Sequence, residues 1–76
     1  MYQRLVVIVV QKVAIKDIAG RVWGWIQIED DGNKKAIDRS GRIVGYYKTF
    51  NNATYDNKGK VVAYGDVVGS LIKMGN

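Results

Sequence analysis

The chain has no cysteine, no histidine and no proline among its 76 residues. Without cysteine there is no disulfide and no thiolate ligand, and without histidine there is no imidazole ligand and no histidine general base. We therefore predict no metal site of these types, no cofactor and no nucleophile–histidine pair, and we expect a protein that is not an enzyme. The lack of cysteine agrees with a reducing compartment, so we expect a cytoplasmic protein.

Long apolar runs are also missing. The run at residues 5–10 is short and is followed by Gln11 and Lys12, without a small-residue cleavage pattern. A charge followed by an apolar run is also found in signal peptides, but this run is too short to cross a membrane and lacks their cleavage pattern, so we interpret it as a strand. We expect no membrane partner.

The carboxylates form no catalytic or metal-binding pattern. The segment QIEDDGNKKAID has a glycine placed as in an EF-hand loop, but Gln27 stands at the first ligand position and no helical pattern flanks it. The glycines do not form a phosphate-cradling loop that leads into a helix. Asp17, Asp38 and Asp56 occupy equivalent places in a repeat, where turn formation accounts for them.

A chain of 76 residues forms one small domain, which we place at residues 1–76. A domain of this size buries only about 60% of the surface that its unfolded chain exposes, so its core is thin. Self-association would bury more apolar surface. We therefore expect a homo-oligomer.

What the chain does contain is a repeat. The phrases DIAGRVWGW, DRSGRIVGY and DNKGKVVAY begin at Asp17, Asp38 and Asp56. After the glycine of each comes a cation, then two apolar residues, a small residue and an aromatic. A weaker copy without the glycine, QRLVVIV, begins at Gln3. The chain therefore contains about four related units.

Each unit predicts a β-hairpin, because the segments after the glycine are rich in Val, Ile, Trp and Tyr and are bounded by polar turns. The predicted first arms are residues 4–10, 21–29, 42–49 and 60–64, and the return arms are residues 13–16, 34–37, 53–55 and 67–72. The turns between arms are residues 11–12, 30–33, 51–52 and 65–66. The Asp-x-x-Gly segments are expected to link one hairpin to the next. The predicted fold class is all-β, with one hairpin unit used about four times around a centre.

The phrases GRVWGWI, AIDRSGRIVGYY and TYDNKGKVVAY resemble the I-Y-D-x-x-G-R-x-V-(G/A)-(W/Y) units of the four-fold β-flower domain family of small bacterial proteins. The resemblance covers nearly the whole chain and is strongest from Ala14 to Tyr64. The chain departs from the pattern at Lys16, where the family has tyrosine, and in its first unit. The resemblance implies short hairpin repeats around a pseudo-fourfold axis and no established activity. A PRC-type small β-barrel, which has similar D-x-x-G phrases and binds partners, is the alternative fold.

Twelve Lys and Arg stand against seven Asp and Glu, which gives a net charge of +5 and a pI near 9.6 and favours anionic partners. The cation of each unit either pairs with the aspartate before it or contributes to a ring that binds an anion. The aromatics at the shared position of the repeat, Trp25, Tyr46 and Tyr64, are expected to pack in the core. Trp23 and Tyr47, which flank this position, either pack in the core or stack on nucleic-acid bases. The candidate anion or nucleic-acid contacts are Arg4, Arg21, Arg42, Lys60, Trp23 and Tyr47.

Two functions remain open from the sequence. The favoured one is a non-catalytic structural or protein-interaction module that self-associates and has a protein partner. The alternative is a basic, weakly sequence-specific domain that binds nucleic acid. The two differ in their salt dependence, because binding to phosphates weakens steeply with salt.

Overall fold

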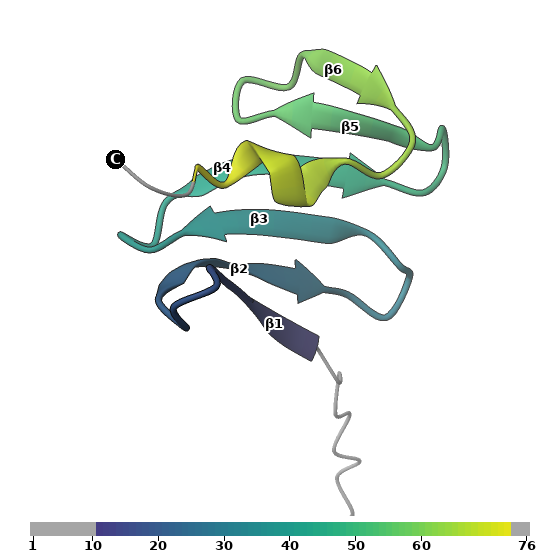
Figure 1. Ribbon diagram of the computed structural model, residues 1–76. Coiled ribbons are helices and arrows are strands. Elements are labelled where there is room, and N and C mark those ends of the chain that lie inside the picture. Colours follow the sequence, from purple (N-terminus) through teal and green to yellow (C-terminus); the bar gives the residue numbers. More distant parts are fainter. Residues whose placement is uncertain (1–10, 74–76) are drawn as a thin grey trace, which may run out of the picture.

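The computed structural model describes residues 11–73. These residues form one antiparallel sheet in which each strand pairs with the next along the chain (Figure 1). The sheet is open rather than closed into a barrel, and the expected all-β class is confirmed. The elements are β1 (Gln11–Lys16), β2 (Val22–Ile28), β3 (Lys34–Asp38), β4 (Ile43–Lys48), β5 (Ala53–Asp56), β6 (Val61–Tyr64) and the short 3-10 helix η1 (Val68–Leu71).

Two predicted hairpins, β2–β3 and β4–β5, form in the expected places. The Asp-x-x-Gly segments, predicted to link separate hairpins, are themselves hairpin turns that join β1 to β2, β3 to β4 and β5 to β6. Alternate turns of such a meander lie at the same end of the sheet, as Figure 1 shows. We call this end the Asp-turn end.

Each Asp-turn is followed by a β-bulge at the same place in the repeat. Ile15 lies opposite Gly24 and Lys16 lies opposite Val22, so Trp23 has no partner of its own. The register shifts in the same way in the other two units, where the extra residues are Val44 and Val62. A bulge changes which face of the sheet the following residues occupy.

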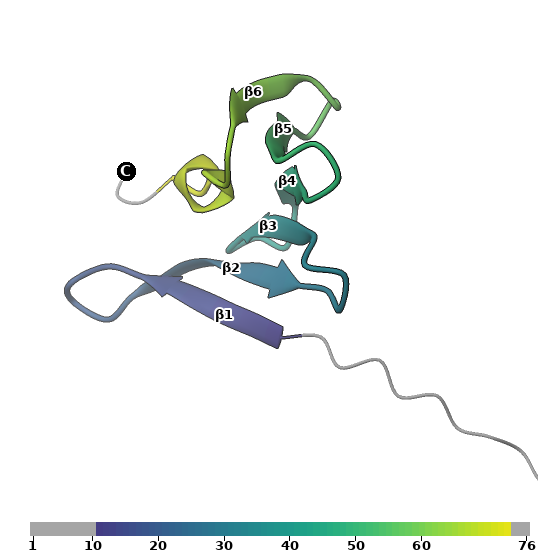
Figure 2. The same ribbon diagram turned by 90° about the vertical axis from the view of Figure 1, so that its right-hand side faces the viewer.

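The hydrophobic core lies on one face of the sheet only. η1 packs over this face, and the other face has no covering element among the described residues (Figure 2). Gly24 lies against Ile72, and Gly45 lies against Leu71. These glycines let residues 67–72, which we call the η1 segment, approach the strands closely. The buried residues of this core cluster are Ile26, Ala36, Val68 and Ile72, and Ala53 of β5 is also buried.

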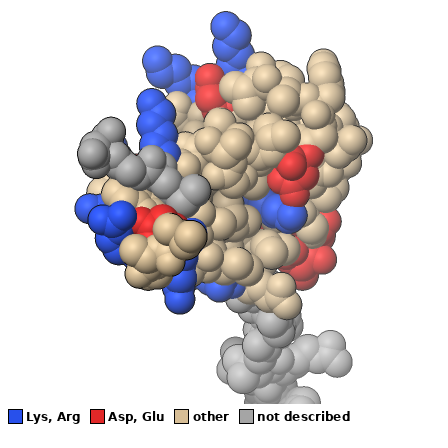
Figure 3. Space-filling view, viewed as in Figure 1, with Lys and Arg blue, Asp and Glu red and all other residues tan. Residues whose placement is uncertain are grey.

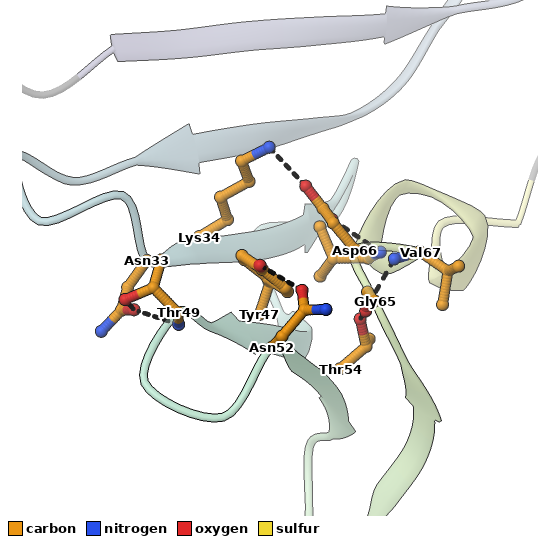
Figure 4. A network of polar contacts seen from close by, with 10 residues as sticks. Asn33, Lys34, Tyr47, Thr49, Asn52, Thr54, Gly65, Asp66 and Val67 are labelled. Carbon is orange, nitrogen blue, oxygen red and sulfur yellow. Dashed lines mark hydrogen bonds and ion pairs between the residues drawn. The ribbon is translucent and has the colours of Figure 1, made fainter.

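The prediction of a return strand at residues 67–72 is wrong, because this segment turns back over the sheet and forms η1. Gly65 has a φ of 91°, which ends β6. The buried Thr54 hydroxyl donates to the Gly65 carbonyl at 2.7 Å and accepts from the Val67 amide at 3.1 Å (Figure 4). These contacts direct Val68 and the residues after it onto the core.

The predicted turn at residues 11–12 is also wrong. Gln11 and Lys12 belong to β1 and pair with Ile28 and Gln27 of β2. Both side chains are exposed on an edge strand, where polar residues are tolerated while the backbone is paired. The predicted first arm, residues 4–10, lies outside the described residues. Within residues 11–73, no helix has the length and apolar character that a membrane span requires.

Candidate functional site

The three Asp-turns share one set of hydrogen bonds, which confirms the predicted turn role of the aspartates. In each turn the carboxylate accepts from the backbone amides two and four residues later, and the glycine amide donates to the aspartate carbonyl. The glycine adopts a positive φ of 85°, 93° or 85°, a conformation that side chains disfavour. These glycines are Gly20, Gly41 and Gly59.

The repeated cations lie beside one another at the Asp-turn end. The Arg21 Nε lies 2.8 Å from the Asp17 carboxylate, and the Arg42 Nε lies 3.5 Å from the Asp38 carboxylate. Both guanidinium groups are exposed, so these ion pairs contribute little stability. Lys60 follows the third turn and forms no ion pair within residues 11–73, whereas Arg4 lies outside the described residues. The described cations thus form a row along one end of an open sheet.

Trp23 is at the centre of a charged cluster at this end. Its indole N–H donates to the Asp17 carboxylate at 2.9 Å. Guanidinium groups of Arg21 and Arg39 lie 5.8 Å and 4.3 Å from the centre of its ring, within the range of a cation–π interaction. Sequence reasoning missed Arg39, although its place directly after the aspartate of the second turn is the signal that locates it.

An open pocket of about 480 Å³ lies beside this cluster. Val44, Leu71 and Trp23 form an apolar wall, and basic side chains surround it. An apolar wall with a cationic rim suits an amphipathic anion. The polar residues that line the pocket are Asp38, Arg39, Ser40, Arg42 and Lys73.

Tyr47 is not part of this cluster. It packs against the core, and its hydroxyl donates to the Asn52 side chain at 2.6 Å (Figure 4). It pairs across the sheet with Lys34, next to the turn that joins β2 and β3. The structure therefore brings together Arg21, Trp23 and Arg42 among the predicted contacts, and separates Tyr47 from them.

The hydrogen bonds of the Asp-turns make the carboxyl groups more acidic. The indole hydrogen bond from Trp23, with further hydrogen bonds from Arg21, lowers the pKa of Asp17 to about 2. The pKa of Asp38 is lowered mainly by the Ser40 hydroxyl and the Arg42 amide. The pKa of Asp56 is lowered mainly by the Lys60 amide.

These pKa shifts predict a stability that falls in acid. The folded pKa values lie below the ordinary aspartate value of about 3.9, so the carboxylates stabilise the fold fully above about pH 5. This contribution is lost as the pH falls from about 4 through the folded value of Asp17, about 2. We expect Asp17→Asn to lower the urea midpoint at pH 7 and to flatten the decline between pH 5 and pH 2. Asp30→Asn, in an exposed turn, is the control, and equal pH profiles for both variants would contradict the prediction.

The shared aromatic position faces away from the core, contrary to the expectation that these rings pack inside. Gly24 and Gly45 occupy the inward positions under the η1 segment, so the residues that follow them, Trp25 and Tyr46, point to the opposite face. Tyr64, the third member of the set, is exposed. Trp23 and Tyr47 pack on the covered side instead. Assignment of the face needed the position of the bulge, which the repeat alone does not reveal.

The uncovered face combines these aromatics with lysines. Residues paired directly across strands share a face, and the pairs Lys12–Gln27, Gln27–Lys35, Lys35–Tyr46 and Tyr46–Tyr55 form a continuous row. Lys12 lies 5.6 Å from the Trp25 ring centre, and Lys48 lies 5.3 Å from that of Tyr46. We call this surface the aromatic–lysine face. Its defining residues are Lys12, Trp25, Lys35, Tyr46, Lys48 and Tyr55.

Charge is unevenly distributed over the molecule. The carboxylates at the Asp-turn end are those of the three turns, two of which pair with Arg21 and Arg42, and Lys73 lines the pocket with Asp38. The remaining carboxylates lie at the opposite end, on the right-hand side of Figure 3. They are Glu29, Asp30, Asp31 and Asp66.

A comparison of the chain with protein-family models, with curated proteins and with solved structures finds no match. Within residues 11–73, no three His, Cys, Asp or Glu side chains lie close enough to hold a metal ion.

Proposed function

We propose that the chain is a non-catalytic structural or protein-interaction module that self-associates through β6. The observation that carries this proposal is the exposure of apolar side chains on an edge strand. Val61, Val62 and Tyr64 are 39%, 47% and 78% exposed. The outer side of β6 pairs with no other strand of the described chain. An exposed apolar edge strand is a template for pairing with another chain.

A two-fold arrangement of two copies pairs the backbone N–H and C=O groups on the outer side of β6. In such a dimer, β6 pairs antiparallel with β6 of the second copy, and the same residues contribute from both sides. Val67, which follows β6 and is also exposed, extends the apolar strip. The thin core of a small domain adds a reason, because pairing removes further apolar surface from water.

We expect Val62→Lys to weaken self-association by about tenfold or more. Lysine on an edge strand opposes pairing, and a two-fold axis brings the two new charges close together. Val62→Thr, which keeps the branched shape, is the control. Sedimentation equilibrium across a concentration series measures the dissociation constant. A wild-type chain that stays monomeric at every concentration, or a lysine variant that associates as tightly as wild type, would contradict the proposal.

We also propose that the repeat units are arranged around a pseudo-fourfold axis, as the resemblance to the four-fold β-flower family implies. The common hydrogen bonds of the three Asp-turns and the common position of the bulges support the equivalence of the units. A crystal structure of the full chain tests the arrangement. We propose a cytoplasmic location on the absence of cysteine.

A second candidate function is the binding of nucleic acid. The observation that favours it is the concentration of cations at the Asp-turn end, where Arg39 and Lys58 add to the predicted Arg21, Arg42 and Lys60. Phosphate contacts of this kind give affinity with little sequence specificity and weaken as salt rises. Self-association through apolar side chains responds little to salt. Anisotropy titrations of labelled oligonucleotides at about 50 mM and 200 mM salt therefore separate the two functions.

A further inference from the structure

We infer that the aromatic–lysine face binds single-stranded nucleic acid by stacking bases on its rings. This inference rests on the second candidate function and assigns it to a different surface from the basic row of the Asp-turns. Its basis is the juxtaposition, on the uncovered face, of Trp25, Tyr46 and Tyr55 with three lysines.

The spacing of the rings suits a single strand. Tyr46 and Tyr55 lie directly opposite each other on neighbouring strands, so their backbones are about 4.8 Å apart. Trp25 lies on β2, two strands away from Tyr46, and is offset along the sheet. Aromatic faces accept any base, since every base has a π-face. A strand that crosses β2 to β5 thus meets successive stacking positions.

Two of the rings along this path also have a lysine ammonium over them. The Lys12 ammonium lies 5.6 Å from the Trp25 ring centre, and the Lys48 ammonium lies 5.3 Å from that of Tyr46. A base that stacks on such a ring takes the place of the ammonium, and the flexible lysine then holds the phosphate of the same nucleotide. Such alternation of rings and cations is the means by which proteins bind single strands without reading sequence.

Charge favours an anionic partner over a second copy of the chain on this face. Lys12, Lys35 and Lys48 all belong to it, and Glu29, 3.5 Å from Lys35, is the carboxylate that pairs with one of them. Two such faces packed together would bring lysines into contact, which is unfavourable when they are desolvated. Phosphates neutralise them instead. A duplex fits poorly, because its bases already stack on one another and cannot reach the rings.

The two tryptophans of the chain provide a reporter on each face. In Trp23→Phe the remaining indole, Trp25, lies on the aromatic–lysine face. In Trp25→Phe the remaining indole, Trp23, lies at the Asp-turn end. We expect a thymidine oligonucleotide of about 15 nucleotides to quench the fluorescence of Trp25 and to leave that of Trp23 nearly unchanged.

Tyr46 and Tyr47 form a matched pair for affinity, because they are adjacent and face opposite sides of the sheet. We expect Tyr46→Leu to weaken binding of the labelled thymidine oligonucleotide about tenfold, since stacking on one ring is lost. We expect Tyr47→Leu to change the affinity less than about twofold, with circular dichroism used to verify that this variant is folded. The logarithm of the affinity falls as the logarithm of the salt concentration rises, and Lys12→Gln should make this slope shallower by about 0.7.

The outcomes separate this inference from the function on which it rests. Quenching of Trp25 with loss of affinity in Tyr46→Leu supports the inference. Equal binding of single strand and duplex, weakened by Arg42→Gln and unchanged by Tyr46→Leu, overturns the inference and retains nucleic-acid binding at the Asp-turn end. No binding of either oligonucleotide at about 50 mM salt overturns both. Loss of self-association in Tyr46→Leu without oligonucleotide binding assigns the face to a second copy and also overturns the inference.

Discussion

We expect Gly24→Ala to lower the free energy of unfolding by about 3 kcal/mol or more, a large share of the stability of so small a domain. A Cβ at this position would overlap the backbone carbonyl oxygen of Ile37 on the neighbouring strand. It would also lie 2.9 Å from the Ile72 side chain. A side chain can rotate away from such a contact, but a carbonyl held in the sheet cannot. The methyl group therefore forces β2 away from β3 or lifts the η1 segment off the core.

Gly69→Ala is the matched control for this prediction. Gly69 lies within η1, its φ is not positive, and nothing stands within 4 Å of the place that a Cβ would take. Alanine should be neutral there or slightly stabilising, because it reduces the entropy of the unfolded chain. Urea unfolding followed by circular dichroism measures both variants. Equal midpoints for Gly24→Ala and Gly69→Ala would show that close packing against the sheet contributes little to stability.

Ile72→Ala is expected to cost about 2 to 5 kcal/mol. Ile72 is 4% exposed and belongs to the core cluster with Ile26 and Val68, against the surface that Gly24 leaves open. Because the core has few residues, the neighbours have little freedom to fill the space that the lost side chain leaves. The η1 segment then loses one of its two buried anchors, and the covered face of the sheet becomes accessible to solvent.

Ile18→Ala provides the comparison, because Ile18 is fully exposed in the first Asp-turn. The same substitution there should change the free energy of unfolding by less than about 0.5 kcal/mol. Hydrogen exchange adds a local readout: Ile72→Ala should increase exchange of amides in β3 and β4 more than Ile18→Ala does. If both variants unfold at the same urea concentration, η1 does not stabilise the sheet in the way that its burial indicates.

These two substitutions also bear on function. They affect the covered face, whereas the proposed contacts of the chain lie on β6 and on the aromatic–lysine face. A variant that releases η1 exposes a second apolar surface and would associate for a different reason. Experiments on self-association and nucleic-acid binding therefore use Val62, Tyr46 and Lys12, whose side chains lie outside the buried core.

The sequence alone determined the three Asp-turns as local structures and the positions of most strands. Asp17, Gly20 and their counterparts encode hydrogen bonds that close within five residues, so the repeat predicts them without knowledge of the rest of the chain. The all-β class and the β2–β3 and β4–β5 hairpins follow from the same local patterns. The repeat also predicted that its cations lie at one level around a centre, whereas the structure places Arg21, Arg42 and Lys60 along one end of an open sheet, where alternate turns of a meander meet.

Only the tertiary structure decided which aromatics face outward. A bulge at Trp23 and the close approach of the η1 segment to Gly24 and Gly45 set the inward positions, and both depend on partners distant in sequence. The same holds for residues 67–72. Their apolar pattern suits a strand, but they bury more apolar surface as a turn over the core. Val68 and Ile72 meet there an apolar face that no other described segment covers, and this non-local burial outweighs the local preference for a strand.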